Sequence, residues 1–331
     1  MHFQVYKIHS DFYYVKNSND EYVCKLRDIL KKQKTDIAVG DYVKLSEDKK
    51  FVVSLVQRKN FLLRPKTANI DLAIVMVSFK QPELDFVQLN RYLTYLKFYN
   101  INSAICVNKE DLENDLKTAK QKIKNIYEKL GYKLFFICAK NNLNLSDLKK
   151  YIKNKNIILM GQSGVGKSTL TNALIPNFNA RTNCVSLKSQ KGCHTTRHSE
   201  IVEYNDFKIT DTPGFSCLKF DFILPHVLID YFDDLKIYKN DCKYSNCLHN
   251  NPDDTDCNII KNLNKIEKTR YDSYLNFLDE TFEYKKTISK RSLKKELLKK
   301  DTGDKIITKI SKRKRQQARN TINQQIEVTD E

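Results

Sequence analysis

An eight-residue glycine-rich segment has the clearest chemical pattern in this sequence. It reads Gly-Gln-Ser-Gly-Val-Gly-Lys-Ser over residues 161–168, after an apolar run and before a helix-forming run. Glycines let backbone N–H groups curl around an anion, and a helix that begins near Lys167 points its positive end at that anion. In such a loop Lys167 binds the β- and γ-phosphates and the Ser168 hydroxyl holds Mg²⁺. The segment therefore predicts a nucleotide phosphate site.

A second motif, Asn-Lys-Glu-Asp at residues 108–111, follows another apolar run and predicts which base is bound. The Asp111 carboxylate can accept two hydrogen bonds, from guanine N1–H and from the 2-amino group. Adenine lacks this donor pair and would leave Asp111 desolvated and unpaired. Cys138-Ala139-Lys140 resembles the loop that backs the base, with Cys in place of the common Ser; an ordinary strand-to-helix loop is the alternative. With the phosphate loop, this motif predicts guanine specificity.

A third motif, Asp-Thr-Pro-Gly at residues 211–214, matches a switch that responds to the γ-phosphate. Asp211 would bind Mg²⁺ through water, and the Gly214 N–H would contact the γ-phosphate. A threonine hydroxyl from the preceding segment is also expected on Mg²⁺, and we favour Thr196 slightly over Thr195. The three motifs together predict a GTP-hydrolysing switch.

The residue after this switch motif bears on catalysis. Phe215 stands where many GTPases place a water-orienting glutamine, and an aromatic ring cannot orient water. We therefore expect slow intrinsic hydrolysis that a partner stimulates. His194 is the candidate for positioning the water, and a switch-loop histidine without a catalytic role is the alternative. The predicted catalytic residues are His194, Lys167 and Thr196. The predicted nucleotide-binding residues are Asn108, Lys109, Glu110, Asp111, Cys138, Ala139, Lys140, Gly161, Gln162, Ser163, Gly164, Val165, Gly166, Lys167, Ser168, Thr169, Asp211 and Gly214.

Four potential metal ligands fall in one short hydrophilic stretch. Cys242, Cys247, His249 and Cys257 supply three thiolates and one imidazole, the ligand set of a closed tetrahedral zinc site. No coordination position stays open for catalysis, so we expect one structural Zn²⁺ beside the Mg²⁺ that accompanies GTP. The other cysteines are scattered, and without an export signal we expect reduced thiols.

The middle of the chain alternates strand-length apolar runs with longer amphipathic stretches. This alternation predicts an α/β domain with a mostly parallel sheet and helices on both faces. The expected strands are 72–77, 104–107, 134–138, 157–160, 201–204 and 207–210. The expected helices are 86–99, 112–130, 145–152 and 167–174, with a further helix at about 265–284.

The ends of the chain differ from this middle. Residues 1–65 alternate apolar and polar positions with turn signals between them, which predicts an OB-like β-barrel. A generic five-stranded β-domain without a ligand of its own is the alternative. From residue 285 on, fifteen Lys and Arg face six Asp and Glu, half of the chain's net charge of +18. We expect four parts: the barrel (1–65), the α/β domain (66–220), a zinc module (221–284) and a flexible or partly helical basic tail (285–331).

The positive charge also indicates a partner. A protein this basic usually meets a polyanion, and nucleic acid is the first candidate; drift in a Lys- and Asn-rich genome is the alternative. No run approaches the ~20 apolar residues that span a bilayer. We see no secretory signal and expect a monomeric protein.

The order of the motifs is unusual, because the base reader precedes the phosphate loop, whereas in ordinary GTPases it comes last. The sheet can be the same, since packing depends on which strands are neighbours. One consequence is that the switch runs directly into the zinc module, so we expect nucleotide state to be transmitted there.

In this order, the motifs resemble the RsgA/YjeQ family of circularly permuted GTPases. The resemblance covers about residues 1–284 and includes His-Thr-Thr at 194–196 and Arg270-Tyr271 with Ser273-Tyr274 after the metal ligands. It implies a cytoplasmic GTPase that binds the small (30S) ribosomal subunit and its rRNA and acts late in subunit maturation. It also implies one Zn²⁺ and slow GTP hydrolysis that the subunit stimulates.

Two features depart from the family pattern: Cys193 in the switch loop and the basic tail. The tail is interpreted as added RNA affinity, with a solvated tail as the alternative. Two other functions stay open at this point. One is an RNA-binding module that holds GTP as a structural ligand, and the other is a metabolic or transport GTPase with incidental charge.

Overall fold

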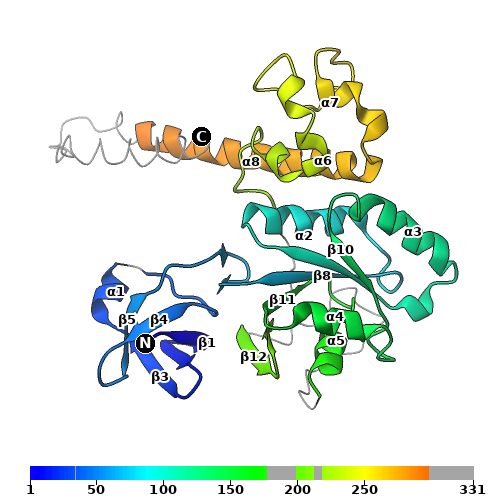
Figure 1. Ribbon diagram of the computed structural model, residues 1–331. Helices are drawn as coiled ribbons and strands as arrows, with labels where there is room; N and C mark the ends of the chain where they lie inside the picture. The colour runs from blue at the N-terminus through cyan, green and yellow to red at the C-terminus, as the bar shows by residue number, and fades with distance from the viewer. Residues whose placement is uncertain (34, 177–198, 212–217, 298–331) are drawn as a thin grey trace, which may run out of the picture. The chain divides into compact units, whose positions relative to one another are not determined.

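The computed structural model describes residues 1–33, 35–176, 199–211 and 218–297, except for the side chains of Asp211, Lys285 and residues 287–297. The chain divides into two compact units (Figure 1). The first comprises Met1–Leu218 together with Glu267–Ser273, and the second comprises Lys219–Ile266 and the residues from Tyr274 on. Every helix in the described ranges is too short or too polar to span a bilayer.

The N-terminal part of the first unit is a closed five-stranded barrel, as the alternating pattern predicted. The strand order is β1-β2-β3-β5-β4, and β4 returns to pair with β1. All pairs are antiparallel except the parallel pair of β3 with β5. The strands are β1 (Phe3–His9), β2 (Phe12–Lys16), β3 (Glu21–Leu26), β4 (Tyr42–Leu45) and β5 (Phe51–Leu55).

Alternate strand residues fill the barrel interior. Phe3, Val5, Val15, Val43 and Val52 are fully or almost fully buried and belong to one apolar cluster. This is the arrangement expected when successive side chains of a strand point to opposite faces. A short helix, α1 (Asp28–Lys32), was not predicted. It buries one side chain, so it leaves no apolar periodicity in the sequence.

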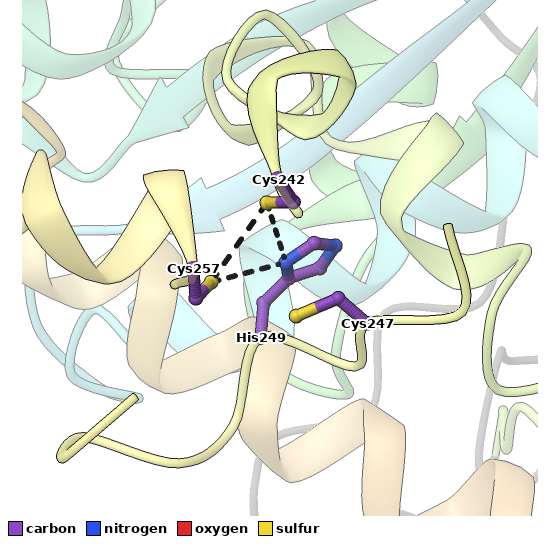
Figure 2. A group of neighbouring side chains, drawn as sticks. All are labelled: Cys242, Cys247, His249 and Cys257. Atoms are coloured by element: carbon purple, nitrogen blue, oxygen red, sulfur yellow. Dashed lines mark hydrogen bonds between the residues drawn. The ribbon is translucent and has the colours of Figure 1, made fainter. Parts of the chain in front are cut away.

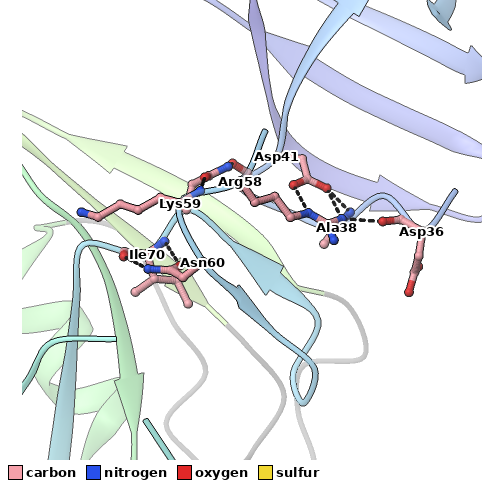
Figure 3. A network of polar contacts seen from close by, with 9 residues as sticks. Asp36, Ala38, Asp41, Arg58, Lys59, Asn60 and Ile70 are labelled. Carbon is pink, nitrogen blue, oxygen red and sulfur yellow. Dashed lines mark hydrogen bonds and ion pairs between the residues drawn. The ribbon is translucent and has the colours of Figure 1, made fainter. Parts of the chain in front are cut away.

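A buried ion pair joins the loop before β4 to the segment that leaves the barrel (Figure 3). The Asp41 carboxylate is fully buried and accepts hydrogen bonds from Arg58 Nε and Nη2, both at 2.7 Å, and from the Ala38 N–H at 2.7 Å. The Arg58 guanidinium also donates to the Asp36 carbonyl and lies 4.1 Å from the centre of the Phe61 ring. Each charge is therefore compensated where water is excluded.

The segment that follows is also held by side-chain to backbone bonds. Asn60 donates to the Ile70 carbonyl at 2.8 Å and accepts from the Ile70 N–H at 2.9 Å (Figure 3). Between these two residues, β6 (Phe61–Leu62) and β7 (Thr67–Ala68) form a small hairpin. This paired segment leads into the first strand of the central sheet.

The central sheet confirms the predicted α/β architecture. Its order is β10-β9-β8-β11-β13-β12, with parallel pairs throughout except that β12 runs antiparallel to β13. β12 also pairs with β1 at Glu200 and Lys7, so the sheet continues into the barrel. The strands are β8 (Leu72–Ser78), β9 (Ser103–Asn108), β10 (Lys133–Phe136), β11 (Asn156–Met160), β12 (Glu200–Tyr204) and β13 (Phe207–Asp211).

Helices cover both faces of this sheet. α2 and α3 lie on one face and α4 and α5 on the other (Figure 1). Leu72, Ile74 and Met76 of β8 belong to the same apolar cluster as Leu148 of α4 and Leu170 of α5. All seven residues of β8 are buried, because both of its faces are covered. The helices are α2 (Phe86–Phe98), α3 (Leu116–Tyr127), α4 (Leu145–Ile152) and α5 (Lys167–Leu174).

Three elements have a boundary that differs from the predicted one by two residues or more. α3 begins at Leu116 because residues 110–112 form a separate 3₁₀ turn and the Asp115 side chain caps the helix by accepting from the Thr118 N–H. β10 ends at Phe136 because Cys138 pairs with Leu143 within the following loop. The last helix, α8 (Lys268–Leu297), begins later than expected and runs into the predicted tail.

A buried polar group attaches the first turn of α8 to α2 within the first unit. The Asn90 amide donates to Ser273 Oγ at 2.9 Å and to the Thr269 carbonyl at 3.2 Å. Its oxygen accepts from Arg270 Nη1 at 3.0 Å and from the Tyr127 hydroxyl at 2.9 Å. Asn90, Ser273, Arg270 and Tyr127 are almost fully buried, so these bonds are needed to compensate for lost water.

The described residues of the second unit form short helical elements in addition to α8. Aromatic rings form its core: Phe232 lies against Tyr274 and Phe277, at centroid distances of 5.6 and 6.0 Å, and Phe220 lies 4.8 Å from Phe277. A bound metal ion is expected to add to the stability of this unit. The short elements are η2 (Leu228–Tyr231), α6 (Asp233–Lys236), η3 (Lys239–Asp241), α7 (Asn258–Lys261) and η4 (Leu263–Lys265).

The buried ion pair of the barrel leads to a first prediction. Arg58→Met leaves the fully buried Asp41 carboxylate without its charge partner and should destabilise the barrel by roughly 3 kcal/mol. Lys59→Met is the matched control: Lys59 pairs with Asp71 on the surface, and its loss should cost under about 1 kcal/mol. Urea unfolding, with hydrogen exchange of the barrel strands, measures both changes. Equal losses in the two variants would contradict the assigned role of Asp41.

Candidate functional site

The predicted phosphate loop connects β11 to α5 at the carboxyl edge of the central sheet. Gly164 and Gly166 have φ values of 84° and 100°, in the left-handed region that glycine adopts without strain. α5 begins at Lys167, and the Lys167 Nζ donates to the carbonyls of Gly161 and Gln162 at 2.8 and 2.7 Å. The ammonium group therefore lies over the loop backbone, where it can exchange these carbonyls for phosphate oxygens.

One glycine of the loop is required for a second reason. A Cβ at Gly166 would lie 2.3 Å from Asn108 Nδ2, far inside contact distance. The base-reading motif therefore packs directly against the phosphate loop. This close approach links two residues, Asn108 and Gly166, that lie 58 positions apart in the chain.

Asn108 joins three of the predicted nucleotide-binding segments. Its Nδ2 donates to the Val165 carbonyl of the phosphate loop at 2.9 Å, and its Oδ1 accepts from the Ala139 N–H of the base-backing loop at 3.0 Å. Asn108 is 3% exposed, so both bonds form out of water. We call this carboxamide with its two partners the Asn108 bridge. It holds the predicted phosphate and base segments at one edge of one domain.

The base-backing loop supplies a partner for the predicted guanine reader. Cys138 Sγ lies 3.0 Å from Asp111 Oδ1 and donates to it. Burial raises the pKa of the Cys138 thiol, and the hydrogen bond to Asp111 adds to this shift, so the thiol keeps its proton at neutral pH. Cys138 and Leu143 close the loop with two backbone bonds of 3.2 and 3.0 Å. Cys138 thus offers a hydrogen-bond donor to Asp111 at the position where the common motif has serine.

The other two residues of the base-reading motif lie differently. Lys109 has a left-handed backbone, with φ of 62°, and its ammonium group donates to the Gln81 carbonyl. Burial lowers the pKa of Lys109 from its usual value. The Glu110 carboxylate contacts Lys120 and Asn144, neither of which was predicted from the sequence.

Several predicted residues lie outside the described ranges. They are the candidate catalytic residue His194, the alternatives Thr195 and Thr196, the switch glycine Gly214, and Phe215. The backbone of Asp211 ends β13, which is parallel to β11, so it reaches the same edge of the sheet as the phosphate loop. The predicted roles of these residues stay predictions.

The four predicted metal ligands of the second unit converge (Figure 2). One ligand atom from each of Cys242, Cys247, His249 and Cys257 lies within 4.8 Å of all the others. Cys242 Sγ lies 3.6 Å from His249 Nδ1 and 4.0 Å from Cys257 Sγ. His249 Nδ1 lies 3.3 Å from Cys257 Sγ. Zinc–sulfur and zinc–nitrogen bonds of about 2.3 and 2.0 Å give tetrahedral edges of roughly 3.5–3.8 Å. The donor set therefore fits a tetrahedral Zn²⁺.

The imidazole is already in the form that binds a metal, whereas a thiolate in this place needs the charge of the metal. Burial lowers the pKa of His249 to about 4, so the imidazole is neutral at pH 7 and can offer Nδ1 to a metal. Burial raises the pKa of Cys257 to about 12, with the neighbouring thiols adding to the shift. A thiolate at this position therefore needs a compensating cation, and a divalent metal would supply it.

Residues outside the ligand set orient it. The Asn258 N–H donates to Cys242 Sγ at 3.3 Å, and the Tyr274 hydroxyl donates at 2.9 Å to the carbonyl of Leu248, next to His249. Asn258 was not predicted, because a backbone N–H leaves no signal in the residue type. Tyr274 was noted in the sequence only as part of the segment after the ligands.

Three protein-family models match the chain. The RsgA N-terminal domain matches residues 4–51 and the RsgA GTPase matches residues 55–221, about half of the chain. A model described as a 50S ribosome-binding GTPase matches residues 156–312. This third match begins at the phosphate-loop strand and omits the base reader at 108–111, as expected where the motif order is permuted. It therefore supports the GTPase class and does not identify a ribosomal subunit.

Individual relatives agree with the family models. Two relatives are named small ribosomal subunit biogenesis GTPase RsgA. The one from Alkaliphilus metalliredigens is 36% identical over 275 residues, which are 81% of this chain and 94% of the relative. The one from Clostridium novyi is 36% identical over 272 residues, which are 81% of this chain and 93% of the relative. The crystal structure of YjeQ from Thermotoga maritima matches with a TM-score of 0.71 at 27% identity, over 85% of this chain and 98% of that one. The crystal structure of YloQ, described as a circularly permuted GTPase, matches with a TM-score of 0.69 at 30% identity, over 85% and 94%.

The close approach at Gly166 gives the second prediction. Gly166→Ala should weaken GDP binding by at least roughly tenfold, because the new Cβ collides with Asn108 and the residue is strained at φ of 100°. Gly131→Ala is the control: Gly131 also has a positive φ, but no atom lies within 4 Å of its Cβ position. It should lower stability and keep the GDP affinity. Titration with a fluorescent GDP analogue tests both variants, and unchanged affinity in Gly166→Ala would refute the packing argument.

Proposed function

Since the chain belongs to the RsgA GTPase family, we propose that it binds GTP at the edge of the sheet described above and acts in late maturation of the small (30S) ribosomal subunit. It hydrolyses GTP to GDP and phosphate, and the subunit stimulates this reaction. The observation that supports a single nucleotide site most directly is the Asn108 bridge. Three segments that would contact the phosphates and the base are held together by one buried carboxamide.

Each segment has a separate task in this proposal. Lys167 neutralises the β- and γ-phosphates, and the backbone N–H groups of the loop bind their oxygens. Ser168 and Thr196 hold Mg²⁺, which when bound neutralises charge on the phosphates during transfer. Asp111 accepts from the guanine base, and Cys138 keeps its carboxylate oriented through the 3.0 Å contact. His194 is the proposed water-positioning residue.

The relatives' names favour turnover over a purely structural nucleotide. They are called biogenesis GTPases of the small ribosomal subunit, and the matching models are GTPase models. On this basis GTP and GDP are the ligands, and a cytoplasmic location follows from the proposed ribosomal substrate. We propose that the protein works as a monomer on the subunit.

Contact with rRNA is supported by the barrel surface. Phe12 is 41% exposed, with the Lys25 ammonium 4.9 Å from the centre of its ring, and Tyr42 and Phe51 are also exposed. Exposed aromatic rings and lysines on an OB-type barrel suit stacking with bases and attraction to phosphates. The basic tail predicted from residue 285 on would add affinity that falls with salt.

We also propose that the Cys/His cluster holds one structural Zn²⁺. Three thiolates and one imidazole fill a tetrahedral shell and leave no site for a substrate. The described elements between residues 219 and 266 are all short, so metal binding would contribute directly to the folding of this unit.

The test of the GTPase proposal is hydrolysis of GTP with and without purified 30S subunits, with ATP as the control nucleotide. We expect slow GTP turnover that the subunits accelerate at least tenfold, and no ATP turnover. Asp111→Asn should exchange guanine for xanthine, because the amide donates to the carbonyl that replaces the 2-amino group. Asp115→Asn, which preserves a helix cap in the same segment, is the matched control.

Two results would contradict the proposal. Unstimulated GTP turnover in the presence of intact subunits would argue against a ribosomal role. Unaltered GTP affinity in Asp111→Asn would argue against Asp111 as the base reader.

The zinc proposal predicts one zinc ion per chain by elemental analysis. Removal by a strong chelator, or Cys247→Ser, should lower the melting temperature of the second unit and increase hydrogen exchange in α7, because metal binding and folding are coupled. Cys24→Ala, in the barrel, should keep the full zinc content. Full zinc content in Cys247→Ser would contradict the assignment.

A further inference from the structure

The third residue of the base-reading motif makes contacts that the motif itself does not explain. Glu110 opens a short 3₁₀ turn next to Asp111, and its two carboxylate oxygens bind two different elements. Oε1 accepts from the Lys120 ammonium of α3, and Oε2 accepts from the Asn144 amide at 3.1 Å. We call these three residues the base-loop clamp.

We propose that Glu110 is a positioning residue for guanine recognition, which fixes the loop of Asp111 to the loop that backs the base. This inference rests on the proposed guanine site and replaces the direct nucleotide contact that the sequence pattern alone predicted for Glu110. The carboxylate acts through Asp111 and does not touch the nucleotide.

The Lys120 side of the base-loop clamp is partly shielded from water. The side chains of Lys120 and Glu110 are 26% and 16% exposed, and the ammonium group also lies 5.3 Å from the centre of the Phe136 ring. Phe136 ends β10, the strand that leads into the base-backing loop. Lys120 therefore ties Glu110 to α3 and to the sheet edge at the same time.

Asn144, the other partner of Glu110, lies at the end of the base-backing loop. The backbone bonds between Cys138 and Leu143 close this loop, and Asn144 follows directly, with a left-handed backbone at φ of 59°. The Glu110 N–H also donates to the Ile137 carbonyl, immediately before the loop. Glu110 thus contacts both ends of the loop that would lie under the guanine ring.

Charge gives a second reason for the Lys120 contact. Glu110 and Asp111 are adjacent carboxylates in the sequence, so two negative charges meet at this turn. The Lys120 ammonium pairs with Glu110 and compensates its charge in a partly shielded place.

The base-loop clamp and the Asn108 bridge hold the site at different places. Asn108 connects the base reader to the phosphate loop, whereas Glu110 has its partners on α3 and on the far end of the base-backing loop. Loss of Glu110 should therefore disturb recognition of the base and leave the phosphate loop intact. This separation makes the proposal testable.

The experiment compares Glu110→Ala with Glu113→Ala in the full chain. Glu113 is the matched control, because its side chain is as shielded from water as that of Glu110. It pairs with Lys80 and contacts neither Asn144 nor Lys120. Binding of GDP, of inosine diphosphate, which lacks the 2-amino group, and of inorganic triphosphate is measured by competition against a fluorescent GDP analogue. Melting temperatures establish that the variants fold.

We expect Glu110→Ala to weaken GDP binding roughly tenfold and to reduce the preference for GDP over inosine diphosphate, while binding of inorganic triphosphate changes less than about twofold. Glu110→Gln keeps an acceptor oxygen and should recover part of the loss. Adding Lys120→Met to Glu110→Ala should cause little further loss, because the two residues act through one contact. Glu113→Ala should match the wild type.

The outcomes separate this inference from the proposed function. A wild-type chain that prefers GDP over ADP, together with an unchanged preference for GDP over inosine diphosphate in Glu110→Ala, would overturn the inference alone. Equal losses for GDP and inorganic triphosphate would also overturn it, since they would indicate a general loss of structure. A wild-type chain that binds ADP as well as GDP would overturn the guanine site itself and the inference with it.

Discussion

The site depends on one buried carboxamide. Asn108 has to satisfy its donor and its acceptor away from water, and it does so with the phosphate loop on one side and the base-backing loop on the other. Both partners are backbone groups, so the bridge constrains where the two loops run and not which side chains they carry. The absence of a Cβ at Gly166 is what allows this approach. The distance between the predicted phosphate and base contacts is therefore set by backbone geometry.

This constraint also explains why the permuted order of motifs is compatible with the fold. β11 lies between β8 and β13, although β8 precedes it by more than 70 positions and β13 follows it by about 50. Parallel strands bring their carboxyl ends to one edge wherever the chain is cut. What the permutation changes is the exit from the sheet. Among the described residues β13 is the last strand, and the second unit begins shortly after it in the sequence, at Lys219.

The sequence predicted the sheet well because each buried strand is a short apolar run, and β8, with all seven residues buried, is the clearest case. It predicted the metal cluster because all four ligands lie within 16 residues.

The predicted start of α3 was wrong because a local cap at Asp115 competes with the amphipathic pattern upstream of it. The residues from 285 to the end of α8 were predicted as part of a basic tail, because their charge is prominent. Lys, Arg, Leu and Glu also favour a helix, and the helix continues to Leu297. The partners of Glu110 could not be predicted, since Lys120 and Asn144 are polar residues of ordinary type whose proximity arises only in the fold.

Three other junctions between segments of this chain share one physical arrangement. Asp41 with Arg58, Asn90 with Arg270, and Glu110 with Lys120 each combine a charged group with directional hydrogen bonds. Apolar contacts fill the cores, but they are non-directional and tolerate sliding. Hydrogen bonds in a shielded site do not tolerate it, because a displaced donor or acceptor is left unpaired at a cost of about 1–3 kcal/mol. Polar contacts at the junctions therefore give a defined geometry to loops that hydrophobic burial alone would leave free to shift, and in a nucleotide site that geometry is what separates one base from another.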